Sequence, residues 1–222
     1  MKVLVTGASS GIGRAVYAGL KKIGHEVCGV SDKGPDFRLD FYHSDSVSVL
    51  AEYLSEIWQN GFSAAILNAG VFFLDEGLPD SDQCAEIYRI NYEFNHEFLD
   101  AVESGGINLR KSGSIILVSS VFASVGDSGS PFYSSMKAAL VCLAKCFAKR
   151  LSDRLIRVNC VSPGYVDTNL VSEGEGSPDL SRVLLGQRLA KPEELFPVFR
   201  ALLECPYITG QDIVVDGGFS VS

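Results

Sequence analysis

Short apolar runs alternate with longer helical patterns along the whole chain, and this alternation limits the folds that the sequence can adopt. We predict strands at Lys2–Thr6, Glu26–Val30, Ala64–Leu67, Ser114–Val118, Arg157–Val161 and Asp212–Val215. We predict helices at Gly11–Ile23, Ser44–Gln59, Ser81–Glu103, Phe132–Ser152 and Pro192–Leu203. The strand runs are almost continuously apolar, as in parallel sheets buried on both faces. The sequence therefore predicts a single doubly wound α/β domain over residues 1–222, with a parallel sheet of about six to seven strands and helices on both faces.

Two stretches depart from this alternation. Only nine residues, Ser31–Leu39, separate the second strand from Asp40, whereas a parallel crossover usually needs a dozen or more. We therefore predict a short third strand that is reached by a loop instead of a helix. The second stretch, 169–186, is rich in glycine and acidic residues. It is typical of a mobile flap over a substrate site.

The charge of the chain limits its partners. A net charge of −8 argues against nucleic acid or an anionic membrane as the main partner. The longest apolar stretches are far shorter than the ~18 residues of a membrane span. Because Met1–Val5 leads directly into a strand pattern, we expect no leader segment and a cytoplasmic protein.

Six cysteines could suggest disulfides, but their positions favour another interpretation. Cys28 and Cys160 fall in apolar strand runs, and Cys142 and Cys146 fall in an Ala/Leu-rich helical pattern. We interpret all four as small buried hydrophobic residues in a reducing compartment. The i, i+4 spacing of Cys142 and Cys146 could suit a metal pair. No histidine or further cysteine completes such a set, so we predict no metal site.

A glycine-rich turn, Thr6–Gly13, follows the first strand and opens the first helix. Gly7 permits a tight turn, Gly11 lets a pyrophosphate approach the backbone, and Gly13 allows close packing of helix on strand. The helix N-terminus adds N–H donors and the positive end of a dipole, which would let an acidic protein hold a dinucleotide. The alternative is an ordinary glycine-rich turn that binds no ligand. The position of the motif between a strand and a helix disfavours this alternative.

Tyr133 and Lys137 lie four residues apart on a predicted helix and therefore share one face. An ammonium about 4 Å from a phenol, at an effective dielectric of about 20, favours the phenolate by roughly 4 kcal/mol. Such a pair could perform acid–base chemistry near neutral pH. The spacing is common by chance, so its weight depends on the rest of the chain.

These motifs, in this order, resemble the short-chain dehydrogenase/reductase family. The resemblance covers nearly the whole chain and continues through Asn68-Ala69-Gly70, Ile90-Asn91, Ser119-Ser120, Pro163-Gly164 and Val215-Asp216-Gly217-Gly218. It implies a Rossmann-type fold and an NAD(P)-dependent oxidoreductase that interconverts a secondary alcohol and a ketone.

The resemblance also implies catalytic roles for four residues. Tyr133 would be the general acid in reduction and the base in oxidation, and Ser120 would hydrogen-bond the substrate oxygen. Lys137 would bind the nicotinamide ribose and lower the pKa of Tyr133. Asn91 would hold a water that links Lys137 to solvent. Taken alone, each could be an ordinary strand-end or helix residue, and Ser119 is an adjacent alternative to Ser120.

A further set of residues would hold the cofactor if the resemblance applies. Besides Tyr133 and Lys137, these are Gly7, Ser9, Ser10, Gly11, Ile12, Gly13, Ser31, Asp32, Asp40, Asn68, Ala69, Gly70, Pro163, Gly164, Val166 and Thr168. Asp40 would accept a hydrogen bond from the adenine amino group, although it is nearly as readily explained as a solvated loop acid. Asp32 would repel a 2′-phosphate and Lys33 would attract one, so we expect NAD, with NADP possible.

The sequence leaves the substrate and the assembly open. Phe72, Phe73, Phe122 and Phe132 lie near the motifs and could line an apolar pocket or belong to the core. A dinucleotide-binding sensor or scaffold without catalysis is the alternative function. Nucleotide-sugar epimerases share the fold, but they need an added C-terminal domain. Relatives commonly pair the two helices over Ser81–Glu103 and Phe132–Ser152 across a two-fold axis, so we expect a homo-oligomer.

Overall fold

Seven parallel strands form the central sheet of the computed structural model, which describes residues 1–73, 80–172 and 178–222. The strands are β1 (Lys2–Thr6), β2 (Glu26–Ser31), β3 (Phe37–Arg38), β4 (Phe62–Leu67), β5 (Leu109–Val118), β6 (Arg157–Pro163) and β7 (Asp212–Val215). Their order is β3-β2-β1-β4-β5-β6-β7, and every neighbouring pair is parallel. The chain reverses direction across the sheet between β1 and β4, where doubly wound folds bind ligands. The predicted fold class is confirmed.

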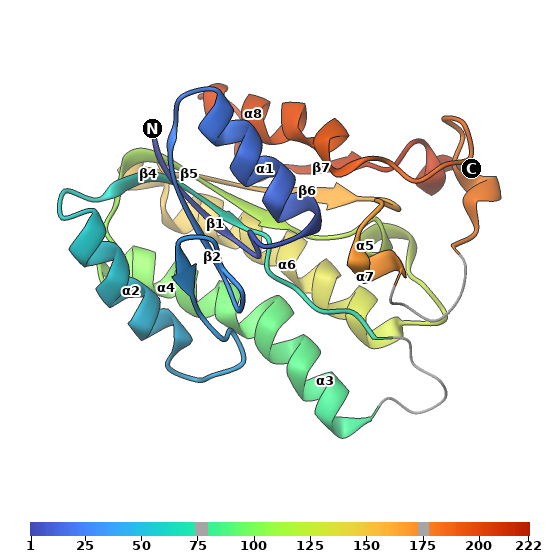
Figure 1. Cartoon of the computed structure of the whole chain (residues 1–222), viewed down its shortest axis with the longest axis horizontal. Coiled ribbons are helices and arrows are strands. Elements are labelled where there is room, and N and C mark those ends of the chain that lie inside the picture. Colours follow the sequence, from blue (N-terminus) through green and yellow to red (C-terminus); the bar gives the residue numbers. More distant parts are fainter. Residues whose placement is uncertain (74–79, 173–177) are drawn as a thin grey trace.

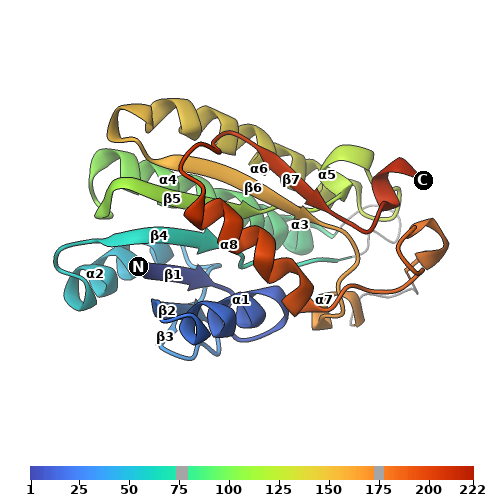
Figure 2. The ribbon, with the colours of Figure 1, turned by 90° about the horizontal axis from the view of Figure 1, so that it is seen from above.

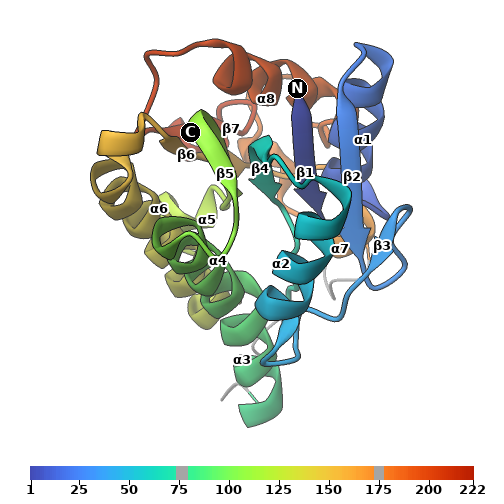
Figure 3. The same cartoon turned by 90° about the vertical axis from the view of Figure 1, so that its left-hand side faces the viewer.

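Helices cover both faces of the sheet (Figures 1 and 3). They are α1 (Gly11–Lys22), α2 (Ser46–Ile57), α3 (Ser81–Ile87), α4 (Phe94–Ser104), α5 (Phe122–Val125), α6 (Pro131–Arg150), α7 (Asn169–Ser172) and α8 (Phe196–Glu204). Short 3₁₀ turns are η2 (Ser152–Arg154), η3 (Leu180–Arg182), η4 (Pro192–Leu195) and η5 (Phe219–Val221). Helices α1 and α8 lie on one face, and α2, α4 and α6 lie on the other (Figure 2). Among the residues described, no helix is long and apolar enough to cross a bilayer.

Alternate residues of β1 supply the two apolar cores. Val3 and Val5 pack into the core under α1 and α8, whereas Leu4 packs into the core under α2, α4 and α6. This alternation follows from the two-residue period of a strand, and it explains why β1 is apolar throughout.

The β3 edge is trimmed as predicted. A loop, not a helix, connects β2 to β3, and β3 pairs with β2 through only two residues. Asp36 supports the loop, because its carboxylate accepts hydrogen bonds from the Gly29 N–H at 2.8 Å and the Tyr17 hydroxyl at 3.2 Å. A methyl group on Gly29 would lie 2.7 Å from the Pro35 ring. The glycine therefore lets this loop close onto the sheet.

The helix predicted over Ser81–Glu103 is divided into three parts. A π-helical turn, η1 (Tyr88–Glu93), separates α3 from α4. The Asn95 side-chain amide donates to the carbonyl oxygens of Ile90 at 3.4 Å and Asn91 at 3.0 Å. These bonds satisfy carbonyls at the wide turn, so the wider winding leaves them paired.

Cys142 and Cys146 are exposed, so the prediction that they are buried is wrong. They lie on the outer side of α6, whereas Leu143 and Phe147 face the core. Apolar composition alone did not distinguish the two sides of this helix. Cys28 and Cys160 are buried as predicted, and none of the six cysteines, all within the described residues, forms a disulfide.

The flap predicted at 169–186 lies partly outside the described residues, which omit 173–177. Its described parts contain the short helix α7 and the turn η3. Its mobility stays a prediction.

Candidate active site

A cavity of about 730 Å³ lies along the carboxyl ends of β1, β2 and β4. Its lining contains Gly7, Ser9, Ser10, Gly11, Ile12, Ser31, Asp32, Lys33, Asp40, Phe41, Asn68, Ala69, Gly70, Val71, Glu86, Ile90, Thr168, Asn169 and Leu170. The volume is within the range of small-molecule sites, about 300–1,000 Å³. The structure thus brings together most of the residues that the sequence assigned to a cofactor.

The glycine-rich turn forms the floor of this cavity. Its glycines stand at positions where a larger side chain would not fit. Gly7 and Gly11 have φ angles of +67° and +50°, a region that favours glycine. A methyl group on Gly13 would lie 2.1 Å from the carbonyl oxygen of Gly7, and one on Gly11 would lie 2.9 Å from Thr168 Cγ2. Gly13 itself is buried behind the turn, where α1 packs closely on it.

Asn68 connects the end of β4 to this turn. Its side-chain amide donates to the carbonyl oxygens of Thr6 and Gly7 at 3.2 and 3.3 Å. The Thr6 hydroxyl accepts from the backbone N–H groups of Asn68 and Ala69 at 2.9 and 3.0 Å. These bonds fix the two strand ends between which the sheet order reverses.

Polar side chains line the end of the cavity next to β2 and β3. The Ser31 hydroxyl is buried and has no hydrogen-bond partner among the described residues. Asp32 accepts from the backbone N–H of Lys33 at 2.8 Å, and Asp40 accepts from that of Tyr42 at 2.9 Å. Ser31 lines the cavity, but its hydroxyl oxygen has almost no accessible surface, so a ligand reaches this oxygen only if the Ser31 side chain rotates.

Ser120, Tyr133 and Lys137 converge between the end of β5 and the first two turns of α6. The Ser120 side chain hydrogen-bonds the Tyr133 phenol and also accepts from the backbone N–H of Phe122 at 3.2 Å. Lys137 Nζ lies 5.5 Å from the centroid of the Tyr133 ring and donates to the Val118 carbonyl at 3.0 Å. Ser119 instead donates to the Lys137 carbonyl at 2.8 Å, so it is Ser120 that contacts Tyr133.

Burial controls the protonation of this pair. It raises the pKa of Tyr133 to about 12, and the hydrogen bond from Ser120 opposes this only in part. Burial also lowers the pKa of Lys137 to about 8. The expectation that Lys137 lowers the pKa of Tyr133 stays a prediction, since the net shift of the phenol here is upward. Desolvation dominates, and the ammonium lies over the ring and bonds a backbone carbonyl.

Asn91, on η1, anchors the segment after β4. Its side chain is fully buried, accepts from the backbone N–H of Val71 at 3.0 Å and donates to the Val71 carbonyl at 2.7 Å. The next residue, Phe72, packs edge-on against Tyr133 with ring centroids 4.9 Å apart. A methyl group on Gly70 would lie 2.6 Å from Asn91 Oδ1 and 3.4 Å from Lys137 Nζ, so both polar groups lie beside the cavity wall at Gly70.

Three predicted cofactor residues, Pro163, Gly164 and Val166, lie at the carboxyl end of β6, away from the described lining of the cavity. A methyl group on Gly164 would lie 2.8 Å from Cα of Asp216, so this glycine permits close backbone packing. Val166 is buried and pairs with Ala190.

The aromatic residues near the motifs divide between two surroundings. Phe72 contacts Tyr133, as described above. Phe122 packs with Tyr165 and Phe219 in a small cluster with ring centroids 5.4–6.3 Å apart. Phe72 therefore lies beside the reactive tyrosine, whereas Phe122 belongs to a separate aromatic cluster.

Sequence reasoning missed several lining residues: Phe41, Val71, Glu86, Ile90, Asn169 and Leu170. Glu86 and Ile90 have helical i, i+4 spacing immediately before Asn91, which could have indicated a shared face. The others follow residues that had been assigned, so their neighbours were the available signal.

Comparisons with known proteins agree with this geometry. A family model described as enoyl-(acyl carrier protein) reductase matches residues 29–220. The chain is 32% identical to the 3-oxoacyl-(acyl-carrier-protein) reductase FabG of Thermotoga maritima, over 98% of this chain and 97% of that protein.

Solved structures give the same result. The aldohexose dehydrogenase of Thermoplasma acidophilum superposes with a TM-score of 0.86 at 26% identity, covering 100% of this chain and 94% of that one. The landomycin C-6 ketoreductase LanV, solved with bound NADP and rabelomycin, superposes with a TM-score of 0.84 at 26% identity, covering 100% and 96%.

Proposed function

The chain belongs to the short-chain dehydrogenase/reductase family and is an NAD(P)-dependent oxidoreductase, and from this premise we propose that Ser120, Tyr133 and Lys137 carry its reaction. The reaction interconverts a secondary alcohol and a ketone. One observation carries the proposal: the hydrogen-bonded Ser120–Tyr133 pair, with Lys137 beside it, adjoins a glycine-floored cavity at the switch point of the sheet.

The cavity suits a dinucleotide in its shape and its donors. A bare backbone at Gly7 and Gly11, together with the N-terminus of α1, offers N–H groups and a positive dipole end to a pyrophosphate. Ser31 lines the end of the cavity that would hold the adenosine half, and its unpaired hydroxyl can bond that half once the side chain rotates. Of the remaining predicted residues, Pro163, Gly164, Val166 and Thr168 would contact the nicotinamide half. When bound, the nicotinamide ring supplies the hydride in reduction and accepts it in oxidation.

Tyr133 and Ser120 act at the substrate oxygen. In reduction, the Tyr133 hydroxyl gives its proton to the carbonyl oxygen while the Ser120 hydroxyl donates a hydrogen bond to the same atom. Two donors at the oxygen stabilise the negative charge that develops there. Lys137 is a buried cation beside the phenol, and it stabilises the phenolate that remains. Asn91 keeps the Gly70–Phe72 wall in place. The water that it would hold between Lys137 and solvent is implied by the family resemblance.

The protonation state of Tyr133 suits its role as the acid in ketone reduction. Because burial raises the pKa of Tyr133 to about 12, the phenol is protonated at neutral pH and ready to act as an acid. Alcohol oxidation needs the phenolate, which the Lys137 ammonium beside the ring would stabilise.

NAD is the preferred cofactor over NADP. The lining beside Ser31 carries the carboxylates of Asp32 and Asp40 and one ammonium, that of Lys33. An additional phosphate on the ribose would meet more repulsion than attraction there.

The substrate is a ketone that the residues around Tyr133 can surround with apolar contacts, as Phe72 does on one side. The relative from Thermotoga maritima is named for 3-oxoacyl groups, so 3-oxoacyl thioesters are tested first, followed by cyclic ketones and sugar-derived alcohols. Loss of the reduced-nicotinamide absorbance in the presence of one ketone class is the expected result. Cofactor binding without turnover of any tested class would favour a non-catalytic sensor.

Two further expectations complete the proposal. The chain forms a homo-oligomer through the outer side of α6, where the exposed Cys142 and Cys146 adjoin Tyr92. The stretch 169–186 acts as the substrate flap, and it begins directly after Thr168, whose Cγ2 would lie 2.9 Å from a methyl group on Gly11. Sedimentation at micromolar concentration tests the first expectation, and a single monomeric species would contradict it. The cytoplasmic location stays a prediction.

A further inference from the structure

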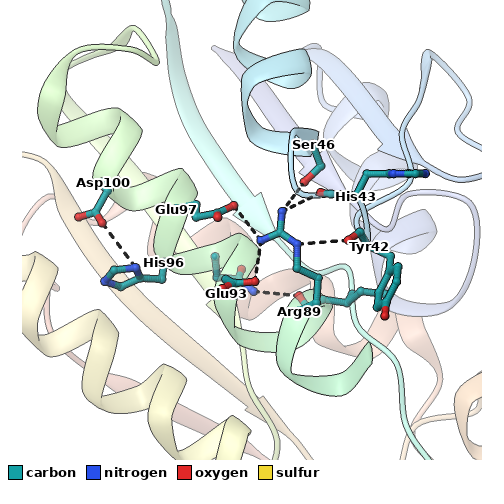
Figure 4. A network of polar contacts seen from close by, with 10 residues as sticks. Tyr42, His43, Ser46, Arg89, Glu93, His96, Glu97 and Asp100 are labelled. Carbon is teal, nitrogen blue, oxygen red and sulfur yellow. Dashed lines mark hydrogen bonds and ion pairs between the residues drawn. The ribbon is translucent and has the colours of Figure 1, made fainter. Parts of the chain in front are cut away.

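Arg89 is a buried arginine with an unusually complete set of partners (Figure 4). Its guanidinium donates to the carbonyl oxygens of Tyr42 at 3.3 Å and His43 at 2.7 Å, and to the Ser46 hydroxyl at 3.2 Å. It also forms ion pairs with the carboxylates of Glu93 at 3.1 Å and Glu97 at 2.8 Å, which follow Arg89 by four and eight residues on η1 and α4. One side chain therefore joins the π-helical turn to the loop before α2.

The loop that Arg89 holds forms part of the cavity wall. Asp40 and Phe41 line the cavity and immediately precede the two carbonyls that accept from Arg89. Tyr42 and His43 also fix Asp40: the backbone N–H of Tyr42 donates to its carboxylate at 2.9 Å, and His43 Nε2 lies 3.6 Å from it. The position of the Asp40 carboxylate thus depends on residues that Arg89 binds.

A second part of the cavity wall belongs to the helical segment that carries Arg89. Glu86 and Ile90, which flank Arg89 in sequence, both line the cavity. Phe41 lines the cavity and packs edge-on against Phe94, the first residue of α4, with ring centroids 4.8 Å apart. Arg89 is therefore the polar connection between two walls that come from distant parts of the chain.

We propose that Arg89 is a positioning residue for the adenosine half of the cofactor. It keeps Asp40 and Phe41 in place against the Glu86–Ile90 wall, so the site is ordered before the ligand binds. The assignment to the adenosine half rests on the proposed function, because the reactive groups lie at Tyr133 and the pyrophosphate at the glycine-rich turn. Asp40 and Phe41, next to β3, are then left for the adenosine. A ligand that must order this loop itself binds more weakly.

The test compares Arg89→Met with a matched control, Arg157→Met. Arg157 is equally buried and donates to the carbonyls of Leu202 and Leu203 at the end of α8, outside the described lining of the cavity. Both variants remove a buried guanidinium and keep a side chain of similar length. Arg89→Lys keeps the charge but lacks the planar fork, so it should bind NADH with intermediate affinity.

The dissociation constants of NADH and AMP are measured by titration for the wild type and the three variants. We expect Arg89→Met to raise the dissociation constants of both ligands by about tenfold. In turnover assays, KM for the cofactor should change more than kcat. Arg157→Met should change either constant by less than about twofold, although its Tm falls. Equal dissociation constants for the wild type and Arg89→Met, or equal losses of affinity in Arg89→Met and Arg157→Met, would overturn this inference and leave the proposed function standing. Wild-type protein that binds neither NADH nor NADPH would overturn the proposed function and this inference with it.

Discussion

Replacing Asn91 with alanine separates a catalytic support from an ordinary structural contact. The Asn91 amide makes two hydrogen bonds to the backbone of Val71 from a fully buried position. The variant leaves the N–H and the carbonyl of Val71 without these partners, and each unpaired buried group costs about 1–3 kcal/mol. Val71 is only half-buried, so water can satisfy part of the loss, and we expect the low end of the sum, about 2 kcal/mol.

The chain contains a closely matched control for this experiment. Asn159, also fully buried, donates to the Ile208 carbonyl at 2.9 Å and accepts from the Gln211 N–H at 3.0 Å, at the edge of the sheet near β7. Asn91→Ala and Asn159→Ala should therefore lower Tm by similar amounts, about 4–8 °C for a chain of this size. Calorimetry measures this loss of stability.

Turnover should distinguish the two variants. Asn91→Ala releases the segment that places Phe72 against Tyr133, so we expect kcat to fall more than about tenfold. Asn159→Ala should keep kcat within about twofold of the wild type, since its partners lie outside the described cavity. Equal losses of kcat in both variants would refute the reasoning, because they would mean that Asn91 acts only through general stability.

Three further predictions concern the cofactor and the pH. Gly13→Ala places a methyl group 2.1 Å from the Gly7 carbonyl oxygen, so it should weaken NADH binding more than about tenfold in a fluorescence titration; an unchanged constant would contradict the fit. Because the pKa of Lys137 is lowered to about 8, its charge is present below that pH and lost above it, so kcat/KM for ketone reduction should fall as pH rises through about 8. A decrease of kcat/KM only near the ordinary pKa of lysine would contradict this prediction. Asp32→Ser should raise the kcat/KM ratio of NADPH to NADH about tenfold, and an unaltered ratio would show that Asp32 does not select the cofactor.

The regular elements could be predicted because their signals are local. β1 and β7 begin and end at the residues expected, since apolar runs bounded by turn residues leave few alternatives. The short β3 was also predictable, from the length of chain available between Ser31 and Asp40. Most of the residues assigned to a cofactor line one cavity because a strand-turn-helix order brings the carboxyl ends of parallel strands to one edge.

Features that depend on the burial of a side chain, or on partners distant in the sequence, could not be predicted. The spacing of Tyr133 and Lys137 placed them on one helix face, but it did not reveal that burial would raise the pKa of the phenol. Arg89 gave no signal because three of its partners lie more than forty residues away and two of these are backbone carbonyls. The π-helical turn at Asn91 pairs its carbonyls with the Asn95 side chain, a bond that the pattern of apolar residues does not reveal.

Substituting Tyr133 by phenylalanine tests the central claim most directly. The variant keeps the ring that contacts Phe72 and removes only the hydroxyl that bonds Ser120. Tyr53→Phe serves as the control, because Tyr53 stacks on Phe37 and lies outside the described lining of the cavity. The account predicts that Tyr133→Phe binds NADH within about twofold of the wild type and loses ketone reduction by more than about a hundredfold, whereas Tyr53→Phe keeps both. Unchanged turnover by Tyr133→Phe would contradict the account.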